Sequence, residues 1–320
     1  MLSPFIFPKI RIREDVDYLL VKSRTKSDLL VRLEILNARM ELPEREKQYY
    51  LSLEKGYQGE QLNDLWVEKL KGEVCVLHNL LFEIKNTQFQ IDTLIITQDR
   101  IYLLEVKNHE GDYIYKNDGF STLSGKETKN HLHQLKRCET LLRQLLQILG
   151  NNYPIESYLI FINPEFFLYN VPPELPIVYP TQLNRFYTNL NKRPSKLNDR
   201  HKILANKLLA EDKRESSYSQ LPTYQYDQVQ KGCTCANCRS LSTVLDKQRV
   251  ICGDCGHSEK FKTAVLRTIA EFTHLFPERR ITTLEVFEWC GGVGSVKGIR
   301  RVLKNNFKPQ GHGKYTYYIK

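Results

Sequence analysis

The sequence predicts an α/β domain that is followed by a small cysteine-rich module and a basic helical module. Helix-like and strand-like segments alternate up to about residue 212, which is typical of an α/β domain. Five of the eight cysteines lie between Cys233 and Cys255. Residues 231–320 contain 16 Lys and Arg against 7 Asp and Glu, so they carry +9 of the chain's net charge of +10. This basic excess indicates a polyanionic partner.

The composition narrows the class of protein. A chain of 320 residues with 41% hydrophobic and 11% aromatic residues has room for two or three domains and is not disordered as a whole. No segment approaches the roughly 20 apolar residues of a membrane span. The start, "MLSPFIFPKIRIRED", is too short and too interrupted by proline for a signal peptide. We therefore expect a cytoplasmic protein without a membrane partner.

The first 212 residues divide into an N-terminal helical segment, 1–50, and the α/β domain, 51–212. Apolar residues at three- and four-residue spacing predict one or two amphipathic helices between Arg13 and about Gly56. Further helices are predicted over residues 59–70 and 131–150, and strands over residues 73–83, 155–163 and 175–180. The polar residues 213–230 lack periodicity and are assigned to a linker.

Two apolar runs in the middle of this domain, "IDTLII" and "IYLLEVKN", are predicted to pair as a hairpin. Asp92 lies near the start of the first run, and Glu105 and Lys107 lie near the end of the second, so the three side chains are expected at one end of a sheet. Two carboxylates and a lysine suit a Mg²⁺ site that hydrolyses phosphodiesters, with Asp92 and Glu105 as metal ligands. Ordinary cross-strand ion pairing is the alternative for these residues alone.

The region around this hairpin resembles the nuclease-related domain family, a branch of the PD-(D/E)xK nuclease superfamily. The similarity begins at "EKGYQGEQLNDLW", where Gly-x-x-Gly-Glu is expected to open a helix, and continues through "IDTLIITQDRIYLLEVKNHEGDY". It ends at a helical glutamine within "NHLHQLKRCETLL" and covers roughly residues 50–165. Two positions depart from the family pattern: His131 replaces a usual proline, and His109 replaces a frequent aromatic residue.

The resemblance implies a restriction-endonuclease-like mixed sheet flanked by helices and a Mg²⁺- or Mn²⁺-dependent deoxyribonuclease activity. It also implies a site composed of Glu60 as the helix acid, Asp92 and Glu105 as metal ligands, Lys107 as the catalytic lysine, and Gln134 as the motif glutamine. For Glu60, an exposed acid at a helix start, stabilised by the helix dipole, is the alternative. His131 and His133 diverge on a helix and are predicted to be surface or polar-packing residues rather than ligands.

The cysteine-rich module, residues 231–259, has the spacing of a structural zinc site. Two Cys-x-x-Cys pairs separated by thirteen residues predict a zinc ribbon in which four thiolates bind Zn²⁺: Cys235, Cys238, Cys252 and Cys255. Gly253 and Gly256 ease the second turn, and "STVL" and "QRVI" are strand-like. Cys233 could replace Cys235, and His257 is another substitute.

Residues 260–320 resemble a winged helix. Helices are predicted over 263–276, after a capping box formed by Thr282 and Glu285, and after Ser295 as N-cap. The final residues, "FKPQGHGKYTYYIK", are predicted to form a hairpin. The third helix carries a basic face opposite an apolar one, and with the hairpin it supplies the predicted DNA-binding residues: Lys297, Arg300, Arg301, Lys304 and Lys314.

Together these features predict a metal-dependent nuclease that hydrolyses phosphodiester bonds in DNA, with the C-terminal modules holding the nucleic acid. Two other classes remain open at this point. One is a non-catalytic DNA-binding regulator that uses the nuclease fold as a scaffold. The other is a protein-interaction adaptor.

Overall fold

The computed structural model describes residues 18–213 and 221–319. The described chain divides into two compact units, which are considered separately: residues 27–51 and 221–319 form unit 1, and residues 18–26 and 52–213 form unit 2. The boundary between 51 and 52 lies within a helix, α2 (Glu44–Val67). Within the described residues, no helix is both long and apolar enough to cross a membrane.

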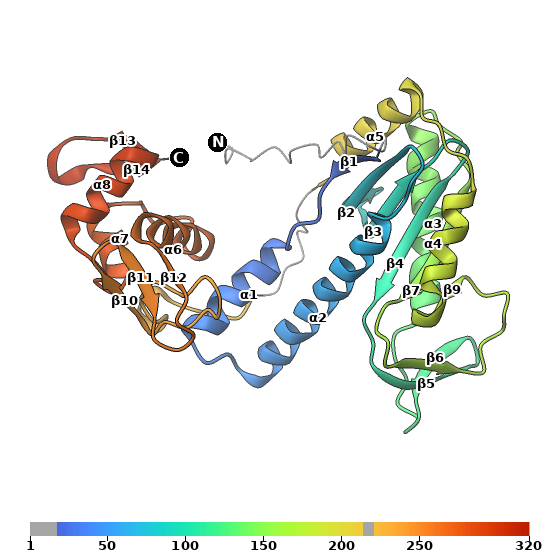
Figure 1. The fold of residues 1–320 in the computed structure, drawn as a ribbon, viewed down its shortest axis with the longest axis horizontal. Helices are drawn as coiled ribbons and strands as arrows, with labels where there is room; N and C mark the ends of the chain where they lie inside the picture. Colours follow the sequence, from blue (N-terminus) through green and yellow to red (C-terminus); the bar gives the residue numbers. More distant parts are fainter. Residues whose placement is uncertain (1–17, 214–220, 320) are drawn as a thin grey trace. The chain divides into compact units, whose positions relative to one another are not determined.

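Unit 2 is built on a six-stranded mixed sheet with the order β1-β2-β3-β4-β7-β9 (Figure 1). Its middle strands β2, β3 and β4 are antiparallel, whereas β1 runs parallel to β2, and β7 runs parallel to both β4 and β9. The strands are β1 (Tyr18–Lys22), β2 (Val74–Ile84), β3 (Thr87–Ile96), β4 (Ile101–Lys107), β7 (Ile155–Phe161) and β9 (Ile177–Val178). The predicted hairpin of β3 and β4 is confirmed.

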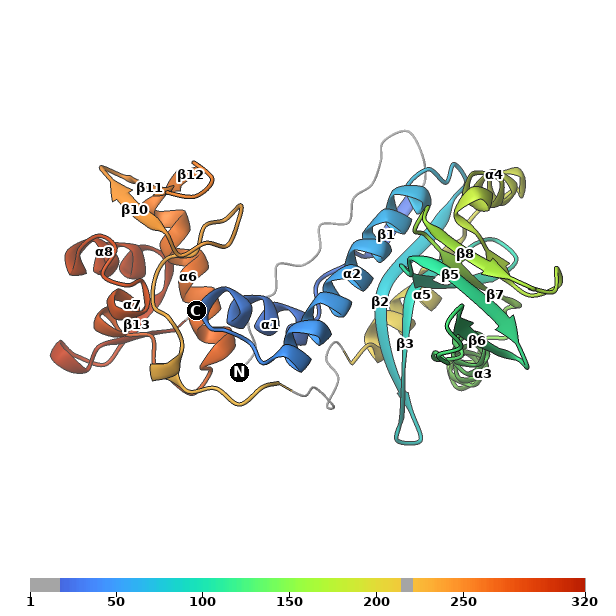
Figure 2. The same ribbon diagram turned by 90° about the horizontal axis from the view of Figure 1, so that it is seen from below.

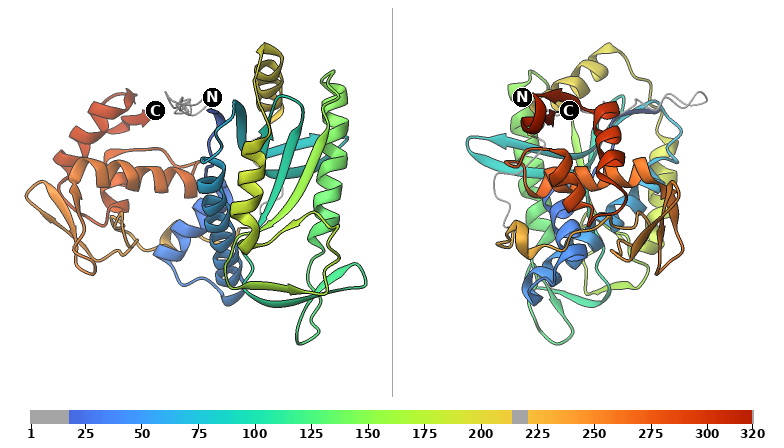
Figure 3. Two further views of the ribbon diagram at one scale, coloured as in Figure 1. Left: turned by 45° about the vertical axis from the view of Figure 1, so that its right-hand side comes forward. Right: turned by 90° about the vertical axis from the view of Figure 1, so that its left-hand side faces the viewer.

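Helices cover both faces of this sheet, as the left view of Figure 3 shows for α3 and α4. Along β4, Ile101 and Leu103 pack with α3 (His131–Ile148) and α5 (Asp199–Glu211). The alternating residue Leu104 packs on the other face with α4 (Leu183–Lys192) and the end of α2. This period-two burial confirms the mixed α/β architecture and leaves the end of β4 for the polar residues Glu105 and Lys107.

A second, three-stranded sheet of unit 2, with the order β6-β5-β8, is absent from the sequence prediction (Figure 2). It comprises β5 (Gly111–Lys116), β6 (Gly119–Thr122) and β8 (Phe166–Tyr169). Its inward residues Phe120, Phe166 and Leu168 join the core that contains Leu103. The additional helices α4 and α5, and the short 3₁₀ turn η1 (Pro180–Gln182), are also unpredicted.

The N-terminal prediction of helices from Arg13 is wrong in part. Residues before 18 lie outside the described part, but Tyr18–Lys22 is the strand β1, because its backbone pairs with β2 across a long sequence separation. Such pairing overrides local helical periodicity. The predicted break near Gly56 is also wrong, since α2 continues from Glu44 to Val67 through both of its glycines.

Unit 1 combines α1 (Asp28–Arg39) with the C-terminal elements. These are η2 (Tyr226–Gln228), β10 (Thr243–Asp246), β11 (Arg249–Cys252), β12 (Ser258–Lys260), α6 (Phe261–Leu275), α7 (Thr283–Trp289), α8 (Val296–Asn306), β13 (Lys308–Gln310), η3 (Gly313–Tyr315) and β14 (Tyr317–Ile319). Arg39 of α1 is fully buried, lies 2.6 Å from Glu271 of α6, and stacks over the Trp289 ring at 4.3 Å. This buried ion pair and stacking fix α1 to α6 and α7.

The three predicted C-terminal helices are present, with Thr282 and Ser295 as N-caps. The capping box at Thr282 is only half formed. Thr282 accepts a hydrogen bond from the backbone N–H of Glu285, but the Glu285 carboxylate pairs with Arg279 at 2.9 Å instead of returning to the cap. In the expected linker, Tyr226 and Val229 are buried beside Trp289.

Candidate functional site

The pairing of β3 with β4 ends beside Asp92 and Glu105 and brings the two residues together. Glu105 lies near the end of β4, but the expected place of Asp92 near the start of its strand is wrong, because β3 already begins at Thr87. Thr93 pairs with Leu104 in the antiparallel register, so Asp92 and Glu105 follow one step further along the two strands. The Oδ2 atom of Asp92 accepts a 2.8 Å hydrogen bond from the backbone N–H of Val106. The two acidic residues are 7% and 2% exposed, respectively. The structure therefore places two carboxylates at a nearly dry sheet end.

Lys107 and Gln134 hold one oxygen of Glu105. The Lys107 Nζ and the Gln134 Nε2 each donate a 2.6 Å hydrogen bond to Glu105 Oε1. Gln134 reaches this position from the first turns of α3, whose N-cap Asn130 accepts hydrogen bonds from two backbone N–H groups. Glu105 Oε2 accepts no hydrogen bond from the described residues, so it is free to bind a cation.

Asp92 and Glu105 together can carry two negative charges, and Lys107 beside them supplies one positive charge. Burial raises the pKa of Glu105, the neighbouring Asp92 raises it further, and Lys107 opposes both effects, which leaves that pKa at about 7. Burial disfavours the charged Lys107 ammonium, but Glu105 and Asp92 outweigh burial and raise its pKa. Two hard carboxylates that repel each other, with one oxygen of each outside this hydrogen-bond network, fit a divalent cation of the Mg²⁺ type.

Glu60 approaches this cluster from α2, and Gly59 makes the approach feasible. A Cβ on Gly59 would lie 2.5 Å from the Cβ of Asn108, the residue after β4, so a side chain larger than hydrogen would push the helix away. Burial and then Asp92 raise the pKa of Glu60 to about 8, with Arg24 opposing them. Because Glu60 lies in the interior of α2, the alternative of a helix-start acid is wrong.

Arg24 contacts the acidic residues of this cluster, and the sequence did not predict it. Its guanidinium pairs with Glu60 and forms two hydrogen bonds with Asp64, at 2.7 and 2.9 Å. It also donates 3.0 Å hydrogen bonds to the backbone carbonyl of Asp92 and to Thr93 Oγ1. The side chain is 4% exposed. The sequence gives only an indirect indication of this role. Glu60 and Asp64 lie four residues apart and so share one face of a helix, and two acids that are buried there need a positively charged partner.

The histidines behave as polar-packing and surface residues. His131 is buried, and its Nε2 lies 2.8 Å from the Nε2 of His109. Burial and then Lys107 lower the pKa of His109 to about 4 and that of His131 to about 3, so both rings are neutral at pH 7. His133 faces away and pairs with the exposed Asp118 at 2.7 Å. The predicted divergence of His131 and His133 is confirmed.

The cysteine cluster in unit 1 has the geometry of a tetrahedral metal site. The sulfurs of Cys235, Cys238, Cys252 and Cys255 all lie within 4.8 Å of one another, and two of the separations are 3.6 Å. Zinc–sulfur bonds of about 2.3 Å in a tetrahedron place the sulfurs about 3.8 Å apart. The backbone N–H of His257, followed by Cys238, lowers the pKa of Cys255 to about 6, which favours the metal-binding thiolate.

The alternative zinc ligand Cys233 lies elsewhere. It is fully buried in the apolar core of unit 1 with Cys290. His257 is not part of the sulfur cluster, although its backbone carbonyl accepts a hydrogen bond from Cys252 at 2.9 Å. Among residues 18–213 and 221–319, the cluster is the only group of three or more His, Cys, Asp or Glu side chains placed so that together they could hold a metal ion.

The basic face predicted for the third C-terminal helix lies on α8. Its four cations are exposed and form no ion pair with the described residues: Lys297, Arg300, Arg301 and Lys304. The opposite face, with Ile299, Val302 and Leu303, is buried in the core of unit 1. The side chain of Lys314 lies outside the described residues. The exposed face of α8 thus carries four positive charges that are free to meet an anion.

One of three comparisons with known proteins found a match, and it covers the region of this site. The family model described as "Nuclease-related domain" (NERD) matches residues 55–162, a range that includes Glu60, Asp92, Glu105, Lys107 and Gln134. A search of curated proteins found no match, and a search of solved structures found none. Residues 55–162, about a third of the chain, are therefore similar to the nuclease-related domain family.

Proposed function

We propose that this chain is a divalent-metal-dependent nuclease that hydrolyses phosphodiester bonds in DNA. The observation that carries the proposal is the convergence of Asp92, Glu105 and Lys107 where the pairing of β3 with β4 ends, inside the family-matched region. Buried carboxylates without full compensation are costly to retain unless they bind a cation or react. A purely structural ion pair would need one carboxylate for Lys107, not two.

Asp92 and Glu105 would hold Mg²⁺ or Mn²⁺ at this sheet end. When bound, such an ion polarises the phosphodiester and lowers the pKa of the attacking water. Lys107 orients that water or neutralises the charge that develops at phosphorus. Gln134 fixes Glu105 Oε1, so the free Oε2 keeps a constant direction. Glu60, whose pKa is about 8, exchanges a proton near neutral pH and is suited to acid–base chemistry.

The C-terminal modules would hold the nucleic acid. We assign residues 231–259 to a zinc ribbon and 260–320 to a winged helix, separated from the α/β domain (51–212) by a linker (213–230). The winged-helix assignment is supported by the order α6, a bridge between Ile281 and Tyr318, α7, α8, and the hairpin β13–β14. In this arrangement α8 is the recognition helix, and Lys314 lies in the wing.

The test is cleavage of supercoiled and linear DNA with Mg²⁺ or Mn²⁺ by the wild type and by Lys107→Ala. We expect the variant to lose about 100-fold or more of the rate, because the Lys107 ammonium no longer neutralises the charge that develops in the transition state. DNA binding, followed by fluorescence anisotropy, should survive. Lys192→Ala, at an exposed lysine of α4, is the matched control and should keep full activity.

A second arm replaces the four cations of α8 by alanine. We expect weaker DNA binding and a shallower dependence on salt, since each lost phosphate contact reduces the slope by about 1. Tight DNA binding without cleavage, across metals and DNA forms, would favour the non-catalytic regulator instead. Absence of any salt-dependent DNA binding would favour the protein-interaction adaptor.

A further inference from the structure

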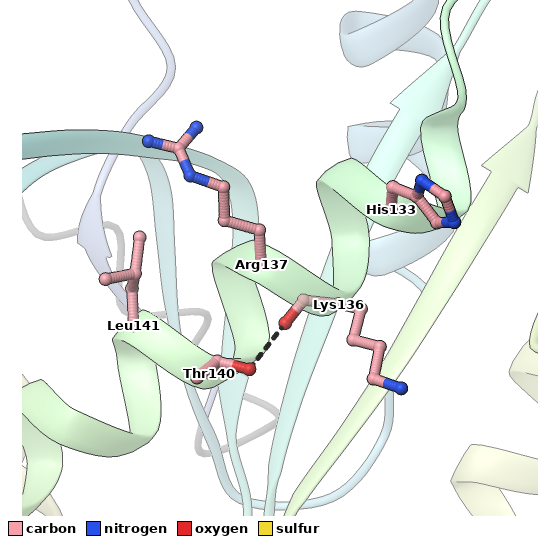
Figure 4. A pocket seen from close by; sticks show the side chains of 5 residues that line it. All are labelled: His133, Lys136, Arg137, Thr140 and Leu141. Carbon is pink, nitrogen blue, oxygen red and sulfur yellow. Dashed lines mark hydrogen bonds between the residues drawn. The ribbon is translucent and has the colours of Figure 1, made fainter.

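The solvent face of α3 carries an open groove of about 330 Å³ (Figure 4). It is lined by five side chains from consecutive turns of the helix: His133, Lys136, Arg137, Thr140 and Leu141. The opposite face of α3 is buried in the core of unit 2. The proposed function gives this groove no role.

The groove has a cationic rim over a floor that is mainly carbon. Lys136 and Arg137 are exposed, and neither forms an ion pair with the described residues. The closest acceptor of the Arg137 guanidinium is the Gln88 carbonyl oxygen, at 3.5 Å. Thr140 donates its hydroxyl to the Lys136 carbonyl at 2.9 Å, so that hydroxyl is engaged within the helix. Two cations are thus available to an anionic ligand.

The acidic residues nearest to the rim are occupied by other partners. Asp118 accepts hydrogen bonds from Tyr115 at 2.6 Å and from His133 at 2.7 Å. Glu139 pairs with Arg143 at 2.8 Å and accepts a 2.6 Å hydrogen bond from Ser157. Neither carboxylate forms an ion pair with Lys136 or Arg137, so both cations keep their hydrogen-bond donors for a phosphate. Asp118 acts on Lys136 only through its longer-range charge.

The groove lies directly beside the candidate site. Gln134 and Arg137 are three residues apart on α3 and are therefore neighbours on the helix surface. Gln134 in turn donates a 2.6 Å hydrogen bond to Glu105. A nucleic-acid backbone that contacts Arg137 would therefore pass close to Gln134 and to the carboxylates of β3 and β4.

We propose that this groove binds the sugar–phosphate backbone of the substrate strand next to the bond that is cleaved. Lys136 and Arg137 pair with phosphates, and the carbon floor packs against a sugar. The inference rests on the proposed nuclease function and adds to it a second contact, with phosphates beside the cleaved bond, that a short phosphodiester cannot make.

The test compares Lys136→Glu/Arg137→Glu with a charge-matched control, Arg185→Glu/Lys192→Glu, on exposed positions of α4 at the other face of the sheet. Both are made in the full chain and assayed on plasmid DNA and on bis(p-nitrophenyl) phosphate, which is too small to span both sites. We expect kcat/KM on DNA to fall at least 10-fold for the α3 variant, with the small diester unaffected. The control should change neither activity.

Two results would overturn the proposal: DNA cleavage equal to that of the α4 control, or an equal loss on both substrates, which would indicate damage to the reacting groups. If the wild type cleaves neither substrate, the nuclease function fails. In that case the role of the groove is tested by DNA binding, measured by fluorescence anisotropy. The α3 and α4 variants are then compared in a chain whose four α8 cations are replaced by alanine. Weaker binding by the α3 variant than by the α4 control supports it, and equal binding contradicts it.

Discussion

The two candidate metal sites differ in how completely the protein surrounds the ion. In unit 1, four cysteine sulfurs lie within 4.8 Å of one another and fill a tetrahedron, so no position is left for a substrate. In unit 2, Asp92 and Glu105 offer two carboxylates beside Lys107, and water and substrate would supply the remaining ligands of a cation bound there. The difference separates a site suited to folding from a site suited to chemistry.

The surroundings of the two sites point the same way. The cysteine cluster lies beside a sheet of three short strands, β10, β11 and β12. In β11 only Val250 and Cys252 are buried, so this sheet has little core of its own. The carboxylates lie on central strands of a six-stranded sheet that is packed on both faces by the buried residues of unit 2. Loss of metal should therefore unfold the ribbon but leave the α/β domain folded.

The largest effect is expected at the cysteine cluster. Cys252→Ser removes one of four ligands and should reduce bound zinc from one per chain to none, as measured by elemental analysis. Since structural zinc contributes on the order of 10 kcal/mol to folding, residues 231–259 should become sensitive to protease. Cys138→Ala, in the core of unit 2, is the control and should retain zinc. Full zinc occupancy in Cys252→Ser would exclude the four-thiolate site.

The next largest effect is expected from Arg24→Met. The substitution leaves Glu60 and Asp64 without their buried cation, and breaking a buried pair costs about 3–5 kcal/mol. Chemical denaturation of the α/β domain should show this loss, whereas Arg24→Lys should recover part of it. A change below about 1 kcal/mol would show that Arg24 does not stabilise the acids of α2.

A smaller, opposed pair of effects is expected at the two glycines of α2. Gly59→Ala should destabilise by about 1–3 kcal/mol and slow cleavage, because its Cβ would lie 2.5 Å from the Cβ of Asn108. Gly56→Ala has no heavy atom within 4 Å and should stabilise the helix by about 0.5–1 kcal/mol. Thermal unfolding measures both changes. Equal shifts would refute the close approach of α2 to β4.

The last effect is absent at neutral pH and is expected in acid. Burial and Lys107 lower the pKa of His131 to about 3. Below about pH 6.5 the unfolded chain therefore binds a proton at this residue, whereas the folded chain does not. Stability from this residue is present above pH 6.5 and decreases as pH falls, by about 1.4 kcal/mol per unit. His131→Phe should flatten the slope between pH 6 and 4, whereas exposed His133→Gln should not. An unchanged slope in His131→Phe would contradict a buried neutral ring.

Local sequence patterns predicted those parts of the fold and of the site that are determined by residues close together in the chain. Period-two alternation predicted the β3–β4 hairpin and the meeting of Asp92 with Glu105, and the Cys-x-x-Cys spacing predicted the sulfur cluster. Helical periodicity likewise predicted α3 and the basic face of α8.

Contacts between distant parts of the chain could not be predicted in this way. The strand β1 forms because Tyr18–Lys22 pairs with residues more than 50 positions away, which no local pattern reveals. Arg24 joins the site through the same pairing, from outside the family-matched region. The sheet of β5, β6 and β8 depends on a parallel contact between Gly111 and Phe166, again far apart in the chain.

The central claim is that Asp92 and Glu105 hold a catalytic divalent cation, and a calorimetric titration with Mn²⁺ tests it most directly. With the cysteine site loaded with zinc, the wild type should bind Mn²⁺, and Asp92→Asn and Glu105→Gln should each weaken that binding at least 10-fold. Asp118→Asn, at an exposed acid, should bind as the wild type does. Equal Mn²⁺ affinity in all four proteins would contradict the account, because the ion would then bind elsewhere.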